Sequence, residues 1–381
     1  MLVGGALGAV LGEEISFLEP VGDVFIRLLV MAAIPLVFFN LLAGLTALTD
    51  LRTFGRLSVK IVGYYLVTTT AALVLGLTAM HLIRPGAGVT LSGPVDEDIG
   101  EVPGVADILL DLVPTNVFQA FAEGNVAQIV VLAVMLGVAT LFLPAEPRDL
   151  LRRGYDALAT LFRKLVDLIL LVAPYGIGAL MAVTVGRYGA ELFGSMARFL
   201  LGVWGTQLLM VGVYMTLLTL LTDRRPWAFL RSMGSLWATT VATTSSLASL
   251  SVALDTAEEI GLPQPVYSFT LPLGAQINKD GTSIMLSAVL LFTAQAAGVS
   301  FTLPEIVTIL LIGLLLSEGS GGIPGGGLVI ALIFVRAFNL PLEVAVIVGG
   351  IYRLVDMGNT TINVMGDMVG TSIVAHSEAR R

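Results

Sequence analysis

The sequence predicts an all-α polytopic membrane protein, and three observations support this. Hydrophobic residues make up 56% of the 381 positions and charged residues 13%, a balance that no soluble domain of this length needs. Apolar runs recur that are long enough to cross a bilayer, which takes roughly 20 residues. Two later segments interrupt this pattern with small or polar residues. The runs lie at Val24 to Leu48, Leu57 to Leu82, Val126 to Phe142, Leu161 to Val172 (extended through Val185) and Phe199 to Leu221.

The chain ends and charged links predict the orientation. Met1 to Gly12 is too short to cross alone and lacks a basic start, so we interpret it as a first span whose beginning has been lost, not as a signal peptide. The acidic link Asp96 to Asp98 is then external, whereas basic segments and the C-terminus face the cytoplasm, as expected for a multi-pass protein of the cell (inner) membrane. The basic residues are Arg52, Arg56, Lys60, Arg148, Arg152, Arg153, Arg224, Arg225, Arg231, Arg380 and Arg381.

Composition also limits the partners. The absence of cysteine excludes disulfides and thiolate metal sites, and a net charge of -8 argues against nucleic acid. A serine hydrolase would lack its catalytic partners, because His81 and His376 lie at span ends and no lysine is near Ser245. We therefore expect neither enzymatic activity nor an organic cofactor.

The most informative stretch is Pro272 to Thr282, where Asn278, Lys279 and Asp280 stand side by side between two apolar runs. This places the three residues near the middle of a predicted span. Charged groups at that depth cost ~2.5 kcal/mol or more each, so they normally pair and mark an ion or substrate path.

Hydroxyl groups mark a second position, in the third span. Tyr65, Thr68 and Thr69 lie within Tyr64 to Thr70, with hydroxyls at helical spacing on one face. They are candidate ligands for a cation. The alternative is that they bond back to the preceding helical turn.

Two interruptions predict re-entrant hairpins. Serine and threonine crowd Thr239 to Ser251, a segment too polar to cross and too apolar for a loop. Glycine and proline fill Ser317 to Gly327 between apolar arms that are each about half a membrane long. A pair of broken hydrophobic segments points to the binding site of a transporter, because half-helix ends direct their dipoles at bound ions.

The last span carries Asp356, Thr360, Asn363 and Asp367 at spacings of four, three and four, which is one face of a helix. Two carboxylates and two neutral ligands therefore point the same way. Thr360 and Asn363 alone would also fit polar contacts between helices.

The order of these motifs resembles the dicarboxylate/amino acid:cation symporters, the glutamate transporter homologues. The serine-rich segment, Asn-x-Asp-Gly-Thr at Asn278, the Ile-Pro-Gly at Ile323 and the aspartate-rich last span follow in family order. Gly22 to Leu29, Val113 to Asn116 and Tyr267 to Ala275 also resemble family segments.

The resemblance implies eight transmembrane helices and two re-entrant helical hairpins in an elevator-type transporter that forms a homotrimer. A trimerising scaffold would comprise residues 1–56 (spans one and two) and 91–190 (spans four and five). A mobile transport domain would comprise residues 57–90 (span three) and 191–381, which include the hairpins at 227–257 and 304–338.

The resemblance also implies the site. The first hairpin and the second would hold a substrate carboxylate, and Asp356 would bind the substrate ammonium. The implied substrate residues are Ser245, Ser246, Thr282, Gly322, Ile323, Gly327, Asp356, Thr360 and Asn363. One sodium ion would be bound by Gly274, Asn278, Asn363 and Asp367, and a second by Tyr65, Thr68, Thr69, Asn278 and Asp280.

Three residues depart from the family near the cation sites. Lys279 replaces a methionine, Gln276 a threonine and Glu318 an apolar residue. We predict that Lys279 and Glu318 form an ion pair, so that a fixed ammonium takes the place of one sodium ion. At ~4 Å such a pair is worth about 4 kcal/mol before desolvation is subtracted. The alternative is that Lys279 extends toward water.

Two further departures concern the substrate side chain. Asn359 stands where the family has the arginine that reads an acidic substrate, and Arg353 lies one turn before Asp356. Either Arg353 replaces the lost guanidinium, or Asn359 accepts a neutral amino acid, or Arg353 is a structural counter-charge to a carboxylate. The sequence favours a neutral or small polar amino acid, with acidic substrates and dicarboxylates next.

Charge counting predicts reduced sodium stoichiometry. Asp280, Glu318, Asp356 and Asp367 outnumber Lys279 and Arg353, and a substrate ammonium balances part of the excess. Coupling to sodium, coupling to a proton on Glu318 or Asp367, and cation-independent exchange all remain open. A channel with the glycine-rich segment as its filter is the rival class, although it gives no role to Asp356.

Overall fold

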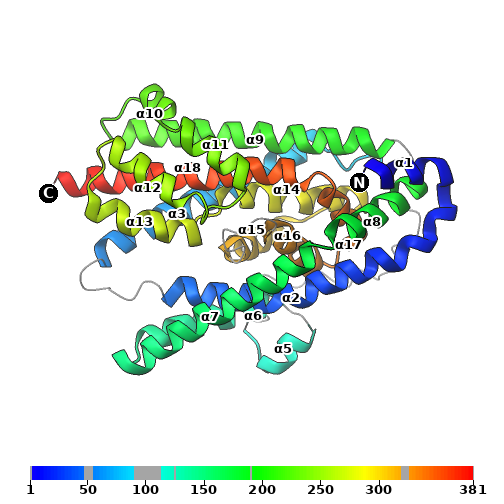
Figure 1. Cartoon of the computed structure of the whole chain (residues 1–381), viewed down its shortest axis with the longest axis horizontal. Coiled ribbons are helices and arrows are strands. Elements are labelled where there is room, and N and C mark those ends of the chain that lie inside the picture. Colours follow the sequence, from blue (N-terminus) through cyan, green and yellow to red (C-terminus); the bar gives the residue numbers. More distant parts are fainter. Residues whose placement is uncertain are drawn as a thin grey trace.

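The computed structural model describes residues 2–46, 55–89, 113–123, 126–188, 191–318 and 326–380. Every regular element within these ranges is a helix, which confirms the predicted all-α class. The helices pack in two groups that lie along opposite sides of the molecule (Figure 1).

One group is formed by N-terminal helices. In it α2 packs against α6, α7 and α8, and α1 packs against α8. The group contains α1 (Leu2–Leu11), the 3-10 helix η1 (Gly12–Leu18), α2 (Glu19–Thr46), α5 (Val117–Glu123), α6 (Val126–Leu141), α7 (Ala145–Leu170) and α8 (Ala173–Tyr188).

The other group surrounds α14, which packs against α3, α18 and α16. It contains α3 (Gly55–Ile83), α9 (Glu191–Leu221), α10 (Pro226–Ser232), α11 (Gly234–Thr243), α12 (Leu250–Glu259), α13 (Gln264–Ile277), α14 (Asp280–Ala296), α15 (Leu303–Glu318), α16 (Gly326–Ala337), α17 (Leu342–Gly349) and α18 (Tyr352–Ala379).

The prediction of one span from Leu161 through Val185 is wrong. The structure ends α7 at Leu170 and begins α8 at Ala173. Pro174 explains the break, because its ring removes a backbone N–H and clashes with the preceding turn. The basic residues Arg148, Arg152 and Arg153 belong to α7, which runs from Ala145, and not to a link between spans.

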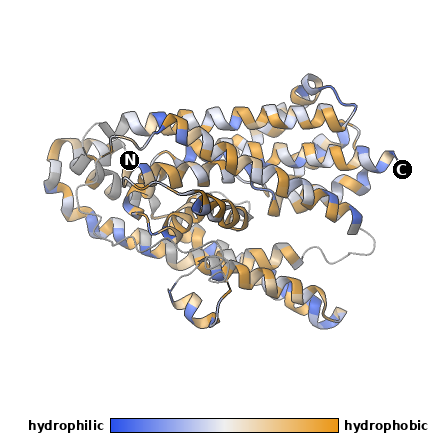
Figure 2. Ribbon diagram, turned by 180° about the vertical axis from the view of Figure 1, so that it is seen from behind, coloured by the Kyte–Doolittle hydropathy of each residue, from blue (hydrophilic) through white to orange (hydrophobic). Residues whose placement is uncertain are grey.

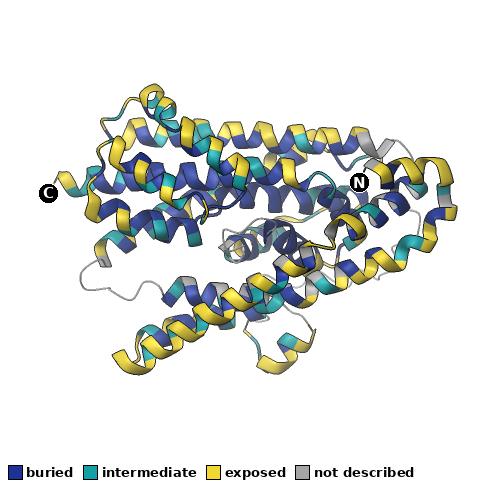
Figure 3. Ribbon diagram, in the orientation of Figure 1, coloured by how far each residue is buried: buried dark blue, intermediate teal, exposed yellow. Residues whose placement is uncertain are grey.

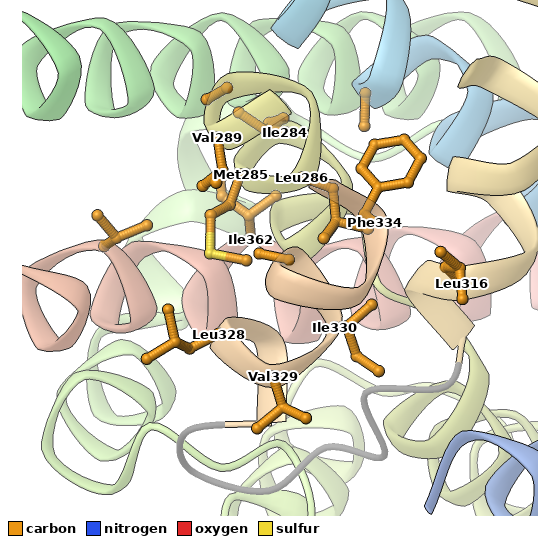
Figure 4. Packing of buried hydrophobic residues seen from close by; sticks show 14 of the residues in the cluster. Ile284, Met285, Leu286, Val289, Leu316, Leu328, Val329, Ile330, Phe334 and Ile362 are labelled. Atoms are coloured by element: carbon orange, nitrogen blue, oxygen red, sulfur yellow. The ribbon is translucent and has the colours of Figure 1, made fainter. Parts of the chain in front are cut away.

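The core of the second group is helix α14, nearly all of whose residues are buried (Figure 3). Helix α14 packs against α16, and Met285 and Leu286 of α14 belong to the same buried apolar cluster as Leu328 and Phe334 of α16 (Figure 4). A fully buried aliphatic side chain contributes about 1.5–3 kcal/mol, so this contact fixes α16 firmly on α14.

Both serine-rich and glycine-rich interruptions lie between short helices. Helices α11 and α12 flank residues 244–249, in which Thr244 adopts a left-handed conformation with φ of 49°. Helices α15 and α16 flank residues 319–325, which lie outside the described ranges. The two arms of each pair contact one another.

Two described segments, Arg56–Ile83 in α3 and Gly194–Leu221 in α9, are long and apolar enough to cross a membrane. Apolar residues occur along nearly all helices, whereas hydrophilic residues gather around α5, α10 and the C-terminal end of α18 (Figure 2).

Candidate functional site

The predicted span around Asn278 is broken at that residue. Helix α13 ends at Ile277, Asn278 is extended (φ -87°, ψ 118°) and α14 begins at Asp280. A break of this kind leaves carbonyl groups at one helix end and N–H groups at the other without intrahelical partners. The sequence therefore located the polar cluster correctly but not the interruption of the helix.

Lys279 satisfies the carbonyl groups at this break. Its Nζ donates to the carbonyl oxygen of Ala275 at 2.8 Å and of Asn278 at 3.2 Å, and the side chain is 1% exposed. The ammonium also interacts electrostatically with Asp280 and Asp367. A cation at the C-terminal end of a helix is favoured by the helix dipole. The alternative that Lys279 extends toward water is wrong, because the side chain is buried.

Asp280 joins three helices. Its Oδ1 accepts a hydrogen bond from Thr69 Oγ1 of α3 at 2.7 Å, and its Oδ2 accepts one from the Tyr214 hydroxyl of α9 at 2.5 Å. Tyr214 also lies 3.3 Å from the carbonyl oxygen of Ile362 on α18. Asp280 is fully buried, so these donors replace the water that a carboxylate would otherwise bind.

Asp367 lies across the break from Asp280. Asn278 Nδ2 donates to Asp367 Oδ1 and to the carbonyl oxygen of Asn363, both at 2.9 Å. The Tyr65 hydroxyl donates to the carbonyl oxygen of Thr270 at 3.3 Å. The structure thus gathers Asn278, Asn363 and Asp367, as the first predicted ion site requires.

The second predicted ion site is gathered as well. Thr69 bonds Asp280 directly, and Thr68 Oγ1 donates to the carbonyl oxygen of Tyr65 at 3.2 Å. The bond from Thr68 is the back-bonding to an earlier helical turn that the sequence left open as an alternative. For Thr69 the interhelical contact is the one observed.

One oxygen at this centre points to a bound cation. Asn278 Oδ1 is buried without a hydrogen-bond partner among the described residues. A buried acceptor left unpaired costs about 1–3 kcal/mol, so such a group is expected to have a partner that binds there. No cluster of three acidic, histidine or cysteine side chains occurs among the described residues, so any ion here takes neutral oxygens beside the carboxylates. Two carboxylates and one ammonium leave a single negative charge, which suits one monovalent cation or a proton.

Gly274 allows the close approach of α13 to these carboxylates. A Cβ atom at this position would collide with Asp367 Oδ1 and with the Tyr65 hydroxyl. We expect Gly274→Ala to lower stability by about 1–3 kcal/mol, as overpacking does, and to reduce any stabilisation by added sodium. Thermal unfolding in detergent with and without sodium measures both effects.

Gly63→Ala on α3 is the matched control, because no atom lies within 4 Å of its added Cβ. This variant should be neutral or more stable by about 0.5–1 kcal/mol, since alanine favours a helix over glycine. Equal stability of Gly274→Ala and the unmodified protein would contradict the tight packing.

Asn363 and Asp367 of the α18 stripe both contact the residues at the break. Asn363 Oδ1 accepts a hydrogen bond from the Gly281 N–H at 2.7 Å, and its Nδ2 lies 3.4 Å from Thr282 Oγ1. Two turns earlier, Asp356 accepts a hydrogen bond from the Tyr352 hydroxyl at 2.9 Å. Asp356 and Thr360 are both buried.

Gly327 lies over this part of α18. It is buried near the start of α16, and an added Cβ would stand 2.7 Å from the Tyr352 hydroxyl. The absence of a side chain therefore lets the second hairpin approach the Tyr352 and Asp356 pair closely.

Asn359 is turned toward α9. Its Oδ1 accepts a hydrogen bond from Gln207 Nε2 at 2.9 Å, its Nδ2 lies 3.4 Å from Met285 Sδ, and the residue is 1% exposed. Both ends of the amide are thus occupied within the protein. This arrangement does not favour Asn359 as the reader of a substrate side chain.

Arg353 reaches the tip of the first hairpin. It donates to Thr244 Oγ1 at 2.6 Å and to the carbonyl oxygen of Ala242 at 2.9 Å, at the C-terminal end of α11. Nearby, Ser245 Oγ accepts a hydrogen bond from the Ala248 N–H at 3.2 Å. Arg353 is exposed, and its guanidinium has five N–H donors, so donors beyond these two bonds remain for a ligand.

Several predicted residues lie outside the described part of the structure. Gly322 and Ile323 belong to residues 319–325, and the side chain of Glu318 is not described. The ion pair between Lys279 and Glu318 therefore stays a prediction. Gln276, which is half-buried on α13, lies two residues before Asn278.

Sequence reasoning missed Gln207, Tyr214 and Thr244. Gln207 and Tyr214 are buried polar residues seven positions apart, or two turns, on one face of the α9 span. A glutamine inside an apolar run is itself a signal, since polar groups are rare at that depth. Thr244 had no such signal, because serine and threonine crowd its neighbourhood.

The whole chain matches known transport proteins. The family model described as "Sodium:dicarboxylate symporter family" matches residues 1–377. The chain is 32% identical to a proton/glutamate-aspartate symporter of Bacillus subtilis (strain 168), over 99% of this chain and 94% of the relative. It is 29% identical to a C4-dicarboxylate transport protein of the same organism (99% and 91%). It is 27% identical to a proton/sodium-glutamate symport protein of Bacillus caldotenax (100% and 94%).

Proposed function

The chain belongs to the sodium:dicarboxylate symporter family, and from this we propose that it carries an acidic amino acid across the inner membrane together with a cation. Membership confirms the resemblance drawn from the sequence motifs. It also makes the protein an integral membrane transporter and not an enzyme.

The observation that carries the substrate assignment is the buried carboxylate of Asp356. This residue is 7% exposed, and it accepts a hydrogen bond from the Tyr352 hydroxyl, against which Gly327 of the second hairpin packs. A substrate ammonium would add a charge-assisted hydrogen bond to this carboxylate, which is a strong interaction away from water. The α-carboxylate of the same molecule would be held by Ser245 and Ser246 of the first hairpin and by Gly322 and Ile323 of the second.

The choice of an acidic side chain rests on Arg353. This guanidinium lies at the hairpin tip one turn from Asp356, and a guanidinium binds a carboxylate in a bidentate manner. Asn359 is engaged by Gln207 and Met285, which removes the support for a neutral substrate. Of the similar proteins, one is named a proton/glutamate-aspartate symporter and another a proton/sodium-glutamate symport protein, in agreement with this choice.

The coupling ion would bind between Asp280 and Asp367. Lys279 balances one of the two carboxylates, so a single monovalent cation neutralises the buried centre. Sodium or a proton would serve, at a stoichiometry lower than that of a centre without the lysine. Sodium would take Asp367, Asn278 Oδ1 and neighbouring backbone oxygens, which fits the unpaired acceptor described above.

Movement would follow the elevator scheme. A scaffold of residues 1–56 and 91–190 would form the trimer, and residues 57–90 and 191–381 would move as the transport domain. Contacts between α3, α9, α13, α14 and α18 support the second unit, because they bind span three to the C-terminal half. Eight spans and two hairpins complete the proposal.

Competition for uptake into proteoliposomes tests the substrate. Unlabelled aspartate and glutamate should each displace labelled aspartate at least ~10-fold better than serine or alanine, because a missing charge partner leaves Arg353 unpaired. Better competition by serine or alanine would contradict an acidic substrate.

The same proteoliposomes test the mechanism. We expect uptake to be driven by an imposed sodium or proton gradient. Exchange that ignores both gradients would favour the cation-independent alternative, and unitary currents that account for the flux would favour a channel.

A further inference from the structure

A cavity of about 530 Å³ lies between α3, α14 and α15, apart from the coupling centre. Apolar side chains form most of its wall, among them Val74 and Leu77 of α3, Leu291 of α14, and Ile309 and Leu310 of α15. Its volume falls within the ~300–1,000 Å³ of typical small-molecule sites. None of the functions assigned above uses this space.

The cavity is as deep as one leaflet of a bilayer. Its lining on α3 extends from Val74 to Arg84, and α3 is a candidate membrane span that ends at Ile83. Ten residues of helix rise ~15 Å, which is half of a hydrocarbon core about 30 Å thick. The end of the cavity at Arg84 is thus at the level of the lipid headgroups.

Two basic side chains lie at this end of the cavity. His81 and Arg84 are three positions apart, both line the cavity and both are exposed. Arg84 also has a φ of 50°, a left-handed conformation that is uncommon for a bulky residue, while its N–H still bonds the carbonyl oxygen of Met80 at 3.0 Å. Glycine is the usual residue at such a helix end. Arginine at this position therefore places a guanidinium here at the cost of backbone strain.

We propose that this cavity holds an acyl chain of a bilayer phospholipid whose anionic headgroup is bound by Arg84 and His81. The apolar wall suits the chain, each buried methylene of which contributes ~0.8 kcal/mol. The guanidinium suits the phosphate, which it binds through two parallel hydrogen bonds. His81 adds a ring N–H donor whether or not it is charged.

The position of the cavity means that a bound lipid would affect the second hairpin. Helix α15 forms one wall and is an arm of the second hairpin, whereas α3 and α14 form the rest. A chain between them fills the space into which α15 would otherwise settle. The bound lipid therefore sets the spacing of the second hairpin from α3 and α14.

Native mass spectrometry of the full-length protein in detergent tests this site, with dioleoyl phosphatidylglycerol and dioleoyl phosphatidylcholine as probes. The unmodified protein should retain the anionic lipid at least fivefold better than the zwitterionic one, because Arg84 binds the charged headgroup. Arg84→Gln should abolish that preference, and Arg336→Gln should keep it, since Arg336 is an exposed arginine in the last turn of α16. Arg84→Gly removes the same guanidinium and relieves the positive φ, so loss of the preference there does not reflect misfolding.

A steric variant tests the chain. Thr78 is an exposed residue that lines the cavity, and Thr78→Trp should fill the space and remove both lipids. Thr70→Trp, two turns earlier at an exposed position of α3, should retain them. Equal retention of phosphatidylglycerol by Arg84→Gln, or by Thr78→Trp, would overturn the proposal. Oleate that displaces phosphatidylglycerol at equal concentration would overturn the assignment to a phospholipid.

Discussion

Asp356→Asn is expected to abolish high-affinity binding of an acidic amino acid. The substitution keeps the size of the side chain and an oxygen for the Tyr352 hydroxyl, but it removes the charge that the substrate ammonium requires. A charge-assisted hydrogen bond between buried groups is worth roughly 3–4 kcal/mol when one partner is removed, which corresponds to a 100-fold to 1,000-fold loss of affinity. Displacement of labelled aspartate from the purified protein measures this loss.

Asp255→Asn is the matched control, because Asp255 is an exposed carboxylate on α12. The affinity of Asp255→Asn for aspartate should equal that of the unmodified protein. Succinate, which has two carboxylates and no ammonium, provides a second arm: Asp356→Asn should bind it as well as or better than the unmodified protein does. Unchanged affinity for aspartate in Asp356→Asn would remove the basis of the substrate assignment.

Lys279→Met is expected to make transport depend on one more external cation. The change removes a buried ammonium that attracts both Asp280 and Asp367. Loss of one partner from a buried set of charges costs ~3–5 kcal/mol, so substrate affinity at low sodium should fall by at least about 100-fold. The slope of log affinity against log sodium concentration, or against pH if protons couple, should rise by about one.

Lys279→Arg keeps the charge and should keep the original slope. Lys60→Met serves as the second control, since Lys60 bonds Ser377 and Glu378 far from the centre, at 2.5 and 2.6 Å. If Glu318 pairs with Lys279 as predicted, Lys279→Met combined with Glu318→Ile should partly restore transport. An unchanged slope and affinity in Lys279→Met would refute the role of the ammonium.

Periodicity in the sequence was sufficient where one helix carries the chemistry. Asp356, Thr360, Asn363 and Asp367 follow the spacing of one helical face, and the structure places them along one side of α18. The polar cluster at Asn278 was recognisable because charge within an apolar run is costly. Both signals involve residues close together in the chain, so a single sequence is enough to detect them.

Contacts between distant segments could not be predicted in this way. The bond from Tyr214 to Asp280 joins residues 66 positions apart, and that from Gln207 to Asn359 joins residues 152 apart. Neither pair has a spacing that a pattern can reveal. The helix break at Asn278 was also missed. At this break the Lys279 ammonium and the Asn363 amide take the place of backbone hydrogen-bond partners. Asn363 belongs to another helix, so the sequence around Asn278 does not reveal this contact.

Arg353 links the tip of the first hairpin to α18. Two hydrogen bonds join α18 to the end of α11, and even at ~1 kcal/mol each they would hold the first hairpin in place about 30-fold over a displaced state. The first hairpin is therefore expected to stay attached to α18 while the substrate binds and leaves. Any motion that frees the tip of this hairpin from α18 must therefore break both bonds of Arg353 first.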